Sequence, residues 1–373
     1  MKVLFLTTAW PSPASPIGGV FVREHARAAA EVAYVRVLHL VRAPASAGLF
    51  RLERVEGEEP PTWRIPYRRF GKPLAQIAFL AGPLVAVRRL RRAGWRPDVV
   101  HAHSFLSALP ALVLGRLLRR PVVYTEHWTI FLPENPGELS APMRRLARLA
   151  LEHADLVLPV SADLERALRE LAPTARTHVV PNVVDEVFTP APGRNGEPTR
   201  LLTVGLLDTP RKGVDILLEA LALVPNREGL RLDVVGEGEL RPGYEALAER
   251  LGLGDTVRFH ALEPKPALAE RMRSADLFVL ASRYENNPCV VLEAMASGLP
   301  VVATRVGGVP ELVTPDSGRL AEPLDPSSFA SALEDALGGD FDRAAIAAAA
   351  RERYGRRAIA RELRDVYERV SSR

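Results

Sequence analysis

Short runs of apolar, mostly β-branched residues alternate with longer helical patterns along nearly the whole chain. Such alternation is typical of βα units on parallel sheets, whose strands are buried on both faces. In the first half, strands are predicted at residues 3–8, 34–40, 99–103, 122–126, 156–160 and 178–181. Helices are predicted between them at residues 20–31, 74–92, 106–118, 142–153 and 162–171.

A segment rich in Pro and Gly, from Thr189 to Pro198, separates this series from a second one and has the composition of a linker. The second series predicts strands at residues 201–204, 232–235, 257–260, 277–281 and 301–304. Its helices are predicted at residues 214–223, 244–251, 266–273 and 288–297, followed by purely helical segments at 329–337, 343–354 and 356–370.

The two series predict an α/β protein with two Rossmann-like, doubly wound domains. Its 373 residues also exceed the size at which one hydrophobic core stops growing. We place the first domain at residues 1–185, the second at 186–355, and a C-terminal helix at 356–373 that packs back on the first domain. Ligands bind at the carboxyl ends of such sheets, so a cleft between the domains is the expected active site.

Composition narrows the classes of function. The one cysteine, Cys289, provides neither a disulfide nor a thiolate metal cluster. No apolar run reaches the ~20 residues of a membrane span, and the N-terminus runs directly into a strand pattern, so we expect a cytoplasmic protein without a signal peptide. Nucleic acid is disfavoured, because no aromatic and basic interleaving accompanies the charge.

The positive charge is concentrated in the first half, with 25 Lys and Arg against 17 Asp and Glu up to Pro190. Two interpretations stay open: a solvated helix face, or a peripheral contact with an anionic membrane. The residues that carry most of this excess are Arg64, Arg68, Arg69, Lys72, Arg88, Arg89, Arg91, Arg92 and Arg96.

The most informative stretch runs from Ser282 to Gly298. Asn287 is a suitable N-cap, Pro288 suits the first helical position, and Gly298 suits a left-handed stop. Glu285 precedes this helix at the carboxyl edge of the second sheet, beside a helix N-terminus that can bind phosphate. Glu293 lies among apolar residues of the helix, where a carboxylate is costly unless a ligand hydroxyl or a buried Arg binds it.

A second candidate is the turn after the strand at 201–204, which contains Gly205, Arg211 and Lys212. Two adjacent cations at the carboxyl end of a strand can bind a diphosphate, although such a pair can also be solvated charge. A third candidate is the Asp340-Phe341-Asp342 sequence, which has the spacing of a metal-binding acidic pair. Because it opens a helix, we interpret it as a cap.

In the first domain, Gly18 and Gly19 between the first strand and its helix allow a close approach of backbone to ligand, although a plain flexible loop explains them equally well. His101 and His103 end the third strand on one face, with His103 nearer the carboxyl edge. A metal site at this pair lacks a third ligand by spacing, so no metal is expected.

Taken together, these features resemble the family 4 retaining glycosyltransferases of the GT-B fold. The most specific element is Glu285 and Glu293 at a spacing of eight, followed by Ala294-Met295-Ala296-Ser297-Gly298. Further matching segments are His101-Ala102-His103, Pro181-Asn182-Val183-Val184-Asp185, Arg211-Lys212-Gly213, Val235-Gly236-Glu237-Gly238 and Gly307-Gly308-Val309-Pro310-Glu311.

The resemblance implies that Glu293 holds the donor ribose, Glu285 contacts the transferred sugar, and Lys212 with Arg211 neutralises the diphosphate. His103 would touch the sugar from the other domain. Members of the family often carry Gly-Arg where this chain has Gly205-Leu206, and Arg211 is our candidate for the missing cation. Gly18, Gly19, Gly205, Asn286, Asn287 and Pro288 complete the expected donor site, which needs neither cofactor nor metal.

The resemblance implies transfer of a hexosyl unit, with retention, from a UDP- or GDP-type donor to a hydroxyl acceptor. We expect the acceptor to be lipid-linked or a cell-envelope glycan, as in polysaccharide biosynthesis, and to lie near Glu126, His127 and Trp128. Two alternatives stay open: a nucleotide-sugar epimerase of the same fold, which needs no acceptor, and a non-catalytic nucleotide-sugar-binding subunit.

Overall fold

The computed structural model describes residues 1–12, 15, 17–43, 52–68, 72–135, 139–191, 198–225 and 227–372. The chain divides into two compact units, residues 1–183 with 356–373 and residues 184–355. Of the predicted linker, residues 192–197 lie outside the described part. Among the described residues, no helix is both long enough and apolar enough to cross a membrane.

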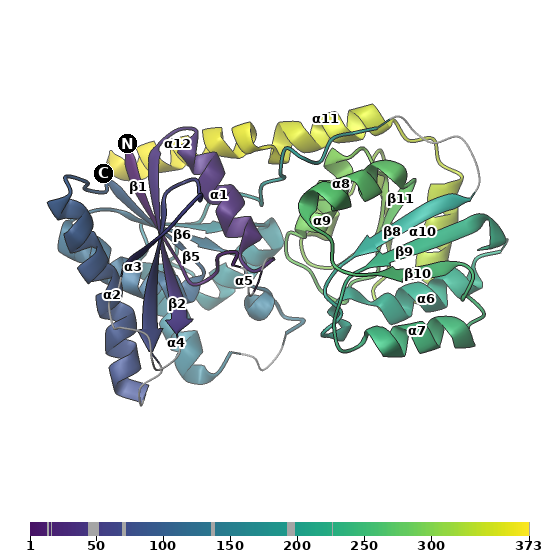
Figure 1. The fold of residues 1–373 in the computed structure, drawn as a ribbon, viewed down its shortest axis with the longest axis horizontal. Helices are drawn as coiled ribbons and strands as arrows, with labels where there is room; N and C mark the ends of the chain where they lie inside the picture. Colours follow the sequence, from purple (N-terminus) through teal and green to yellow (C-terminus); the bar gives the residue numbers. More distant parts are fainter. Residues whose placement is uncertain are drawn as a thin grey trace. The chain divides into compact units, whose positions relative to one another are not determined.

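The first unit contains a sheet in the order β3-β4-β2-β1-β5-β6-β7 (Figure 1). All its neighbours are parallel except β3, which pairs antiparallel with β4. Its strands are β1 (Lys2–Thr7), β2 (Tyr34–Ala43), β3 (Glu53–Val55), β4 (Thr62–Arg68), β5 (Val99–His103), β6 (Val122–Glu126) and β7 (Leu156–Pro159). Its α-helices are α1 (Val20–Ala30), α2 (Lys72–Arg92), α3 (Phe105–Leu118), α4 (Ala141–His153), α5 (Ala162–Leu171) and α12 (Arg356–Ser371).

Apolar residues cover both faces of this sheet. Leu4 and Leu6 of β1 belong to a core shared with α2 to α5. Val3 and Phe5, which alternate with them, belong to a second core with α1 and α12. Strands buried in this way carry nearly continuous apolar runs, which explains why most of them could be recognised in the sequence.

The C-terminal helix α12 belongs to the first unit although the chain reaches it from the second. Leu363, Tyr367 and Val370 are buried in the core that includes β1 and α1. The hydroxyl of Tyr367 lies 2.8 Å from Nδ1 of His101. Figure 1 shows α12 alongside α1, and the contacts between the two helices agree.

The second unit contains a wholly parallel sheet in the order β10-β9-β8-β11-β12-β13. Its strands are β8 (Thr199–Val204), β9 (Leu230–Val235), β10 (Val257–His260), β11 (Leu277–Leu280), β12 (Val301–Thr304) and β13 (Gly318–Ala321). Its α-helices are α6 (Val214–Leu223), α7 (Arg241–Arg250), α8 (Lys265–Ser274), α9 (Cys289–Ala296), α10 (Pro326–Leu337) and α11 (Arg343–Tyr354).

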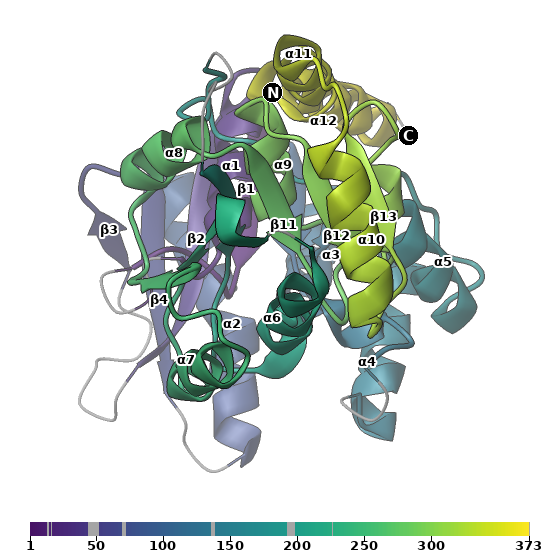
Figure 2. The same cartoon turned by 90° about the vertical axis from the view of Figure 1, so that its right-hand side faces the viewer.

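Helices cover both faces of this second sheet as well. Helices α6, α7 and α10 share one core with it, and α8, α9 and α11 share the other. Figure 2 shows α6 and α10 next to each other. Helix α11 begins after Asp342, whose side chain accepts a hydrogen bond from the backbone N–H of Ala345, so the capping interpretation of Asp340-Phe341-Asp342 is confirmed for Asp342.

Four details of the predicted strands are wrong. Strands β3, β4 and β13 were not predicted. Strand β4 carries Pro66 among charged and aromatic residues, β3 has only three residues, and β13 contains Gly318 and Arg319 and no β-branched residue. Residues 178–181 do not form a regular strand. They remain extended, and the N–H groups of His178 and Val180 donate to carbonyls of Val157 and Pro159 at 2.9 and 3.0 Å.

Candidate active site

The strand order brings two predicted segments of the second unit together. Strands β8 and β11 are neighbours, and the chain leaves them toward opposite edges of the sheet. At such a switch point the loops after the two strands diverge and leave a crevice at the carboxyl edge. The loop after β8 carries Gly205 and Lys212, and the loop after β11 carries Ser282 and Glu285.

At this point Lys212 and Glu285 form a buried ion pair. The Lys212 Nζ donates to Glu285 Oε1 at 2.7 Å, and the two residues are 9% and 4% exposed. The hydroxyl of Ser282 donates to the same oxygen at 3.0 Å. Burial alone would raise the pKa of Glu285, but the charges of Lys212 and Arg211 and these hydrogen bonds bring it below its ordinary value. Glu285 is therefore a carboxylate, and it holds the Lys212 side chain at the carboxyl edge of the sheet.

Two glycines make this pair geometrically possible. A Cβ on Gly205 would lie 2.8 Å from both Cγ and Cε of Lys212, so only glycine leaves room for the lysine side chain. Gly213 has φ 61°, and its Cβ would lie 1.9 Å from the carbonyl oxygen of Ala281. The backbone N–H of Arg283 also donates to the carbonyl of Arg211 at 2.8 Å. The cationic turn is thus fastened directly to the end of β11.

Helix α9 begins one residue later than predicted. Pro288 occupies the N-cap with extended backbone (φ −68°, ψ 114°), so the assignment of Asn287 as N-cap is wrong. Asn286 and Asn287 are buried, at 4% and 5% exposure, in the segment that enters the helix. Gly298 has φ 78° after the last turn, which confirms the predicted left-handed stop.

The remaining donor-side candidates differ in accessibility. Glu293 is 8% exposed in the middle of α9, and Arg211 is half-buried beside Lys212. Leu206, at the position where family members often carry Arg, is 41% exposed.

Burial, followed by the charge of Glu293, raises the pKa of the Cys289 thiol to about 12, so this cysteine is neutral and unsuited to nucleophilic chemistry.

The first unit has an equivalent switch point between β1 and β5. Gly19 follows β1 and has φ 72°, and its Cβ would lie 2.3 Å from the carbonyl carbon of Ala9. Glycine is therefore required at Gly19 by the fold itself. Gly18 precedes it, half-buried, and its N–H donates to the carbonyl of Ser15 at 3.2 Å.

His101 and His103 lie on one face of β5, as predicted, with ring centroids 4.5 Å apart. Nε2 of His101 lies 2.7 Å from Thr125 Oγ1 and its other nitrogen faces Tyr367, so this ring joins β5 to β6 and α12. Nδ1 of His103 lies 3.0 Å from Nε2 of His127. Burial and the neighbouring histidines lower the pKa values of His101 and His103 well below the usual range.

Glu126 has a different environment from the one we expected on the acceptor side. It is fully buried, and its carboxylate accepts hydrogen bonds from the Tyr124 hydroxyl and from the backbone N–H groups of Phe105, His127 and Trp128. Burial raises its pKa to about 7, although these four hydrogen bonds oppose the rise. Glu126 thus holds the start of α3 and the following loop in place, while His127 and Trp128 are half-buried.

Sequence reasoning missed a cluster around His103. His25 from α1 and His127 from the loop after β6 lie beside it, and one ring nitrogen of each lies within 4.8 Å of the others. The statement that a third ligand is lacking was based on spacing alone. Because the three residues come from separate βα units, only the strand order brings them together.

The fold and the two switch-point sites define a GT-B glycosyltransferase, and comparisons with known proteins specify the family. Residues 18–188 match the model of Glycosyltransferase Family 4, and residues 185–353 match that of Glycosyl transferases group 1. The chain belongs to family 4 of the glycosyltransferases.

Curated relatives match most of the chain in sequence. The chain is 34% identical over 339 residues to the D-inositol 3-phosphate glycosyltransferase of Xylanimonas cellulosilytica, covering 79% of this chain and 77% of the relative. It is 31% identical over 278 residues to a glycogen synthase of Mycobacterium tuberculosis, covering 71% and 67%.

Solved structures match over the whole chain. Sucrose-phosphate synthase from Thermosynechococcus elongatus superposes with a TM-score of 0.77 at 24% identity, covering 100% of both chains. Anabaena HepE in complex with UDP superposes with a TM-score of 0.76 at 22% identity, covering 99% and 100%. At these identities the likeness concerns the fold.

Proposed function

We propose that this glycosyltransferase transfers a hexosyl unit, with retention of configuration, from a UDP- or GDP-type sugar to a hydroxyl acceptor. The observation that carries the proposal is the buried pair of Lys212 and Glu285 at the switch point of the second unit. An ammonium has three N–H donors, and Glu285 uses one of them, so others remain for a diphosphate. HepE, which has been solved with UDP and with UDP-glucose, has the same fold.

In this proposal the reaction needs neither a protein nucleophile nor a metal. The bond from the sugar C1 to the phosphate oxygen breaks, and the acceptor oxygen bonds to C1 on the same face. The acceptor proton passes to the departing phosphate oxygen. The protein contributes fixed charge: Lys212 and Arg211 face the diphosphate, the start of α9 adds its dipole, and Glu285 holds Lys212 in place while it contacts the sugar.

The other expected residues keep their proposed roles. Glu293 binds the ribose of the donor, and Asn286, Asn287 and Pro288 shape the segment around it. His103 contacts the transferred sugar, and His127 and Trp128 lie on the acceptor side. For Glu126 we propose a positioning role, because its carboxylate is already saturated by four donors.

Replacing Lys212 tests the proposal directly. Lys212→Met keeps the aliphatic stem and removes the charge; if one donor to the developing diphosphate charge is worth about 3 kcal/mol, turnover falls roughly 10²-fold. The measurement is sugar transfer, with product formation in the absence of acceptor as a check for epimerase activity. Arg319→Ala removes a cation that pairs with Asp335 elsewhere in the same unit and is the matched control. Near-normal transfer by Lys212→Met would refute the role.

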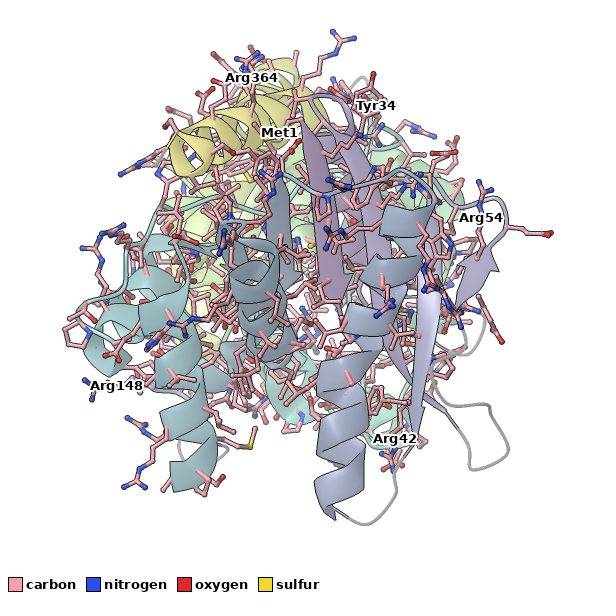
Figure 3. All side chains as sticks on the ribbon, turned by 90° about the vertical axis from the view of Figure 1, so that its left-hand side faces the viewer. Met1, Tyr34, Arg42, Arg54, Arg148 and Arg364 are labelled. Atoms are coloured by element: carbon pink, nitrogen blue, oxygen red, sulfur yellow. The ribbon has the colours of Figure 1, made fainter. Side chains whose placement is uncertain are left out.

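We further propose that the acceptor is presented at an anionic membrane, at its cytoplasmic face. Exposed arginines gather on α2, α3 and α4 and at their ends, and Glu152 is the one acidic residue among the described side chains of these helices. Figure 3 shows this face, with Arg148 of α4 directed outward. The arginines are Arg88, Arg89, Arg91, Arg92, Arg116, Arg119, Arg120, Arg144, Arg145 and Arg148. Of the basic residues noted in the sequence, Arg69 and the side chains of Arg68 and Lys72 lie outside the described residues.

Exposed apolar side chains accompany these arginines. Leu117 is 65% exposed, and Leu146 and Leu149 on α4 are 45% and 48% exposed. A surface that combines arginines with exposed leucines suits an anionic lipid interface, where each cation contributes about 1 kcal/mol.

A triple Arg144→Ala, Arg145→Ala, Arg148→Ala variant should lose binding to phosphatidylserine vesicles at low salt. The matched triple of Arg357, Arg361 and Arg364 on α12 should bind like the wild type, and equal binding by both triples would contradict the proposal.

A further inference from the structure

Three histidines from separate elements of the first unit form a compact cluster. His25 lies on α1, His103 at the end of β5 and His127 just after β6. The ring of His103 stacks on that of His127 at 5.3 Å, and the ring of His25 lies 5.6 and 5.2 Å from the two. His25 and His103 are fully buried and His127 is half-buried, so the cluster reaches the surface on the side of His127.

The hydrogen bonds fix which ring nitrogens carry protons. Nε2 of His25 lies 2.9 Å from the carbonyl oxygen of Pro181, which only accepts, so the proton is on Nε2 and Nδ1 has a lone pair. Nδ1 of His127 lies 3.2 Å from Oδ1 of Asn182, which leaves Nε2 to accept from Nδ1 of His103. The remaining lone pair of His103 is then on Nε2.

Two of these lone pairs are unsatisfied inside the protein. Nδ1 of His25 and Nε2 of His103 are buried and have no hydrogen-bond partner in the described structure. A buried acceptor without a donor costs free energy, so Nδ1 of His25 calls for a ligand and Nε2 of His103 for a proton. Burial also lowers the pKa of His25 to about 4, and that of His127 well below its usual range, which keeps the rings in the neutral form that binds metals.

We propose that His25, His103 and His127 form a binding site for a divalent transition-metal cation of the Zn²⁺ class. Imidazole nitrogens favour Zn²⁺ and similar borderline cations over Mg²⁺ or Ca²⁺, which prefer oxygen. A cation here takes the place of the proton between Nδ1 of His103 and Nε2 of His127. Two nitrogens at ~2.0 Å from a tetrahedral ion are about 3.3 Å apart, close to the 3.0 Å between these two atoms, and the displaced proton moves to Nε2 of His103. The carbonyl of Pro181 orients the ring of His25, and the side chain of Asn182 orients that of His127, as hydrogen-bond partners of metal ligands commonly do.

A cation at this site acts as an inhibitor of the transferase. Coordination draws a nitrogen of His103 away from the sugar contact proposed for it, so Zn²⁺ should lower transfer while Mg²⁺ should not. This inhibitory consequence rests on the proposed function. Cation binding itself rests only on the cluster, and it can be measured without any sugar substrate.

Competition with a chromophoric chelator on the metal-stripped, full-length protein tests the site. We expect one Zn²⁺ per chain, and Co²⁺ should give the intense visible absorption of a tetrahedral complex. His25→Gln keeps an amide donor for the Pro181 carbonyl but removes the ligand nitrogen, and it should weaken Zn²⁺ binding by about 10²-fold. His127→Gln should do the same, and it replaces a half-buried ring if the first variant does not fold. His178→Gln, at an exposed histidine of the same unit, is the control and should bind like the wild type.

The outcomes separate the two proposals. Absence of Zn²⁺ binding by the wild type at micromolar free cation, or full binding by a folded His25→Gln or His127→Gln protein, would overturn the site and leave transfer untouched. Binding with no effect on transfer would keep the site and remove its inhibitory consequence. Loss of transfer in the Lys212 variant alone concerns the proposed function and leaves the cation site unchanged.

Discussion

Gly205 gives the most specific prediction for the donor side. An alanine there would place Cβ 2.8 Å from two carbons of Lys212, closer than real Cβ contacts allow. Gly205 is not among the residues with positive φ, so alanine adds no backbone strain and the lysine side chain must yield instead. Gly205→Ala should therefore displace Lys212 from Glu285 and cost the fold only about 1 kcal/mol.

The loss should appear mainly in activity. A hydrogen bond between charged groups is worth about 1.5 to 3 kcal/mol, so kcat/KM for the donor should fall roughly 10- to 100-fold. Steady-state transfer kinetics and urea unfolding measure the two effects separately. Gly229→Ala is the matched control, because a Cβ at Gly229 meets nothing within 4 Å.

A double variant identifies the cause. If Gly205→Ala acts through Lys212, it should change nothing further in a Lys212→Met background, since interacting residues are not additive. Additive losses, or wild-type kinetics for Gly205→Ala alone, would refute the reasoning.

Two further predictions concern stability. Burial lowers the pKa of His25 from 6.5 to about 4. As pH falls from 6.5 toward 4, only the unfolded chain binds a proton at this residue, so the free energy of unfolding decreases by about 3 kcal/mol. His101, His103 and His127 act in the same direction. Urea unfolding of the first unit should therefore become much easier between pH 7 and 5, and an unchanged midpoint would contradict the buried neutral cluster. Gly213→Ala combines φ 61° with a Cβ 1.9 Å from a backbone oxygen, so it should cost about 2 kcal/mol or more and abolish transfer, whereas Gly243→Ala, where a Cβ meets nothing, should be near neutral in the same urea experiment.

The sequence predicted most of the fold because the physics of doubly buried strands is local. Strands such as β1 and β11 are apolar at nearly every position, and turns or capping residues limit the helices between them. Strand β4 was not predicted, because Arg64, Pro66 and Tyr67 interrupt any apolar run, although its Ile65 is buried. Its partner β2 supplies the pairing that its own residues do not indicate.

The site was predictable as residues but not as contacts. Lys212 and Glu285 stood out in the sequence for their charge beside a strand end, yet their 2.7 Å contact depends on β8 and β11 being neighbours. The close approach of Lys212 to Gly205 likewise cannot be predicted from the sequence alone. Glu126 was placed on the acceptor side because of its loop, and only the structure reveals that four donors surround it.

Nucleotide binding tests the central claim, that Lys212 and Glu285 mark a diphosphate site. Thermal unfolding of the wild type and of Lys212→Met would be measured with UDP, GDP and ADP and with uridine, guanosine and adenosine, since a ligand at 100 times its Kd stabilises by about 2.7 kcal/mol. The account predicts that at least one nucleoside diphosphate raises the Tm of the wild type well above its nucleoside, and that Lys212→Met loses this difference. Equal shifts in both proteins, or no shift with any diphosphate, would contradict it.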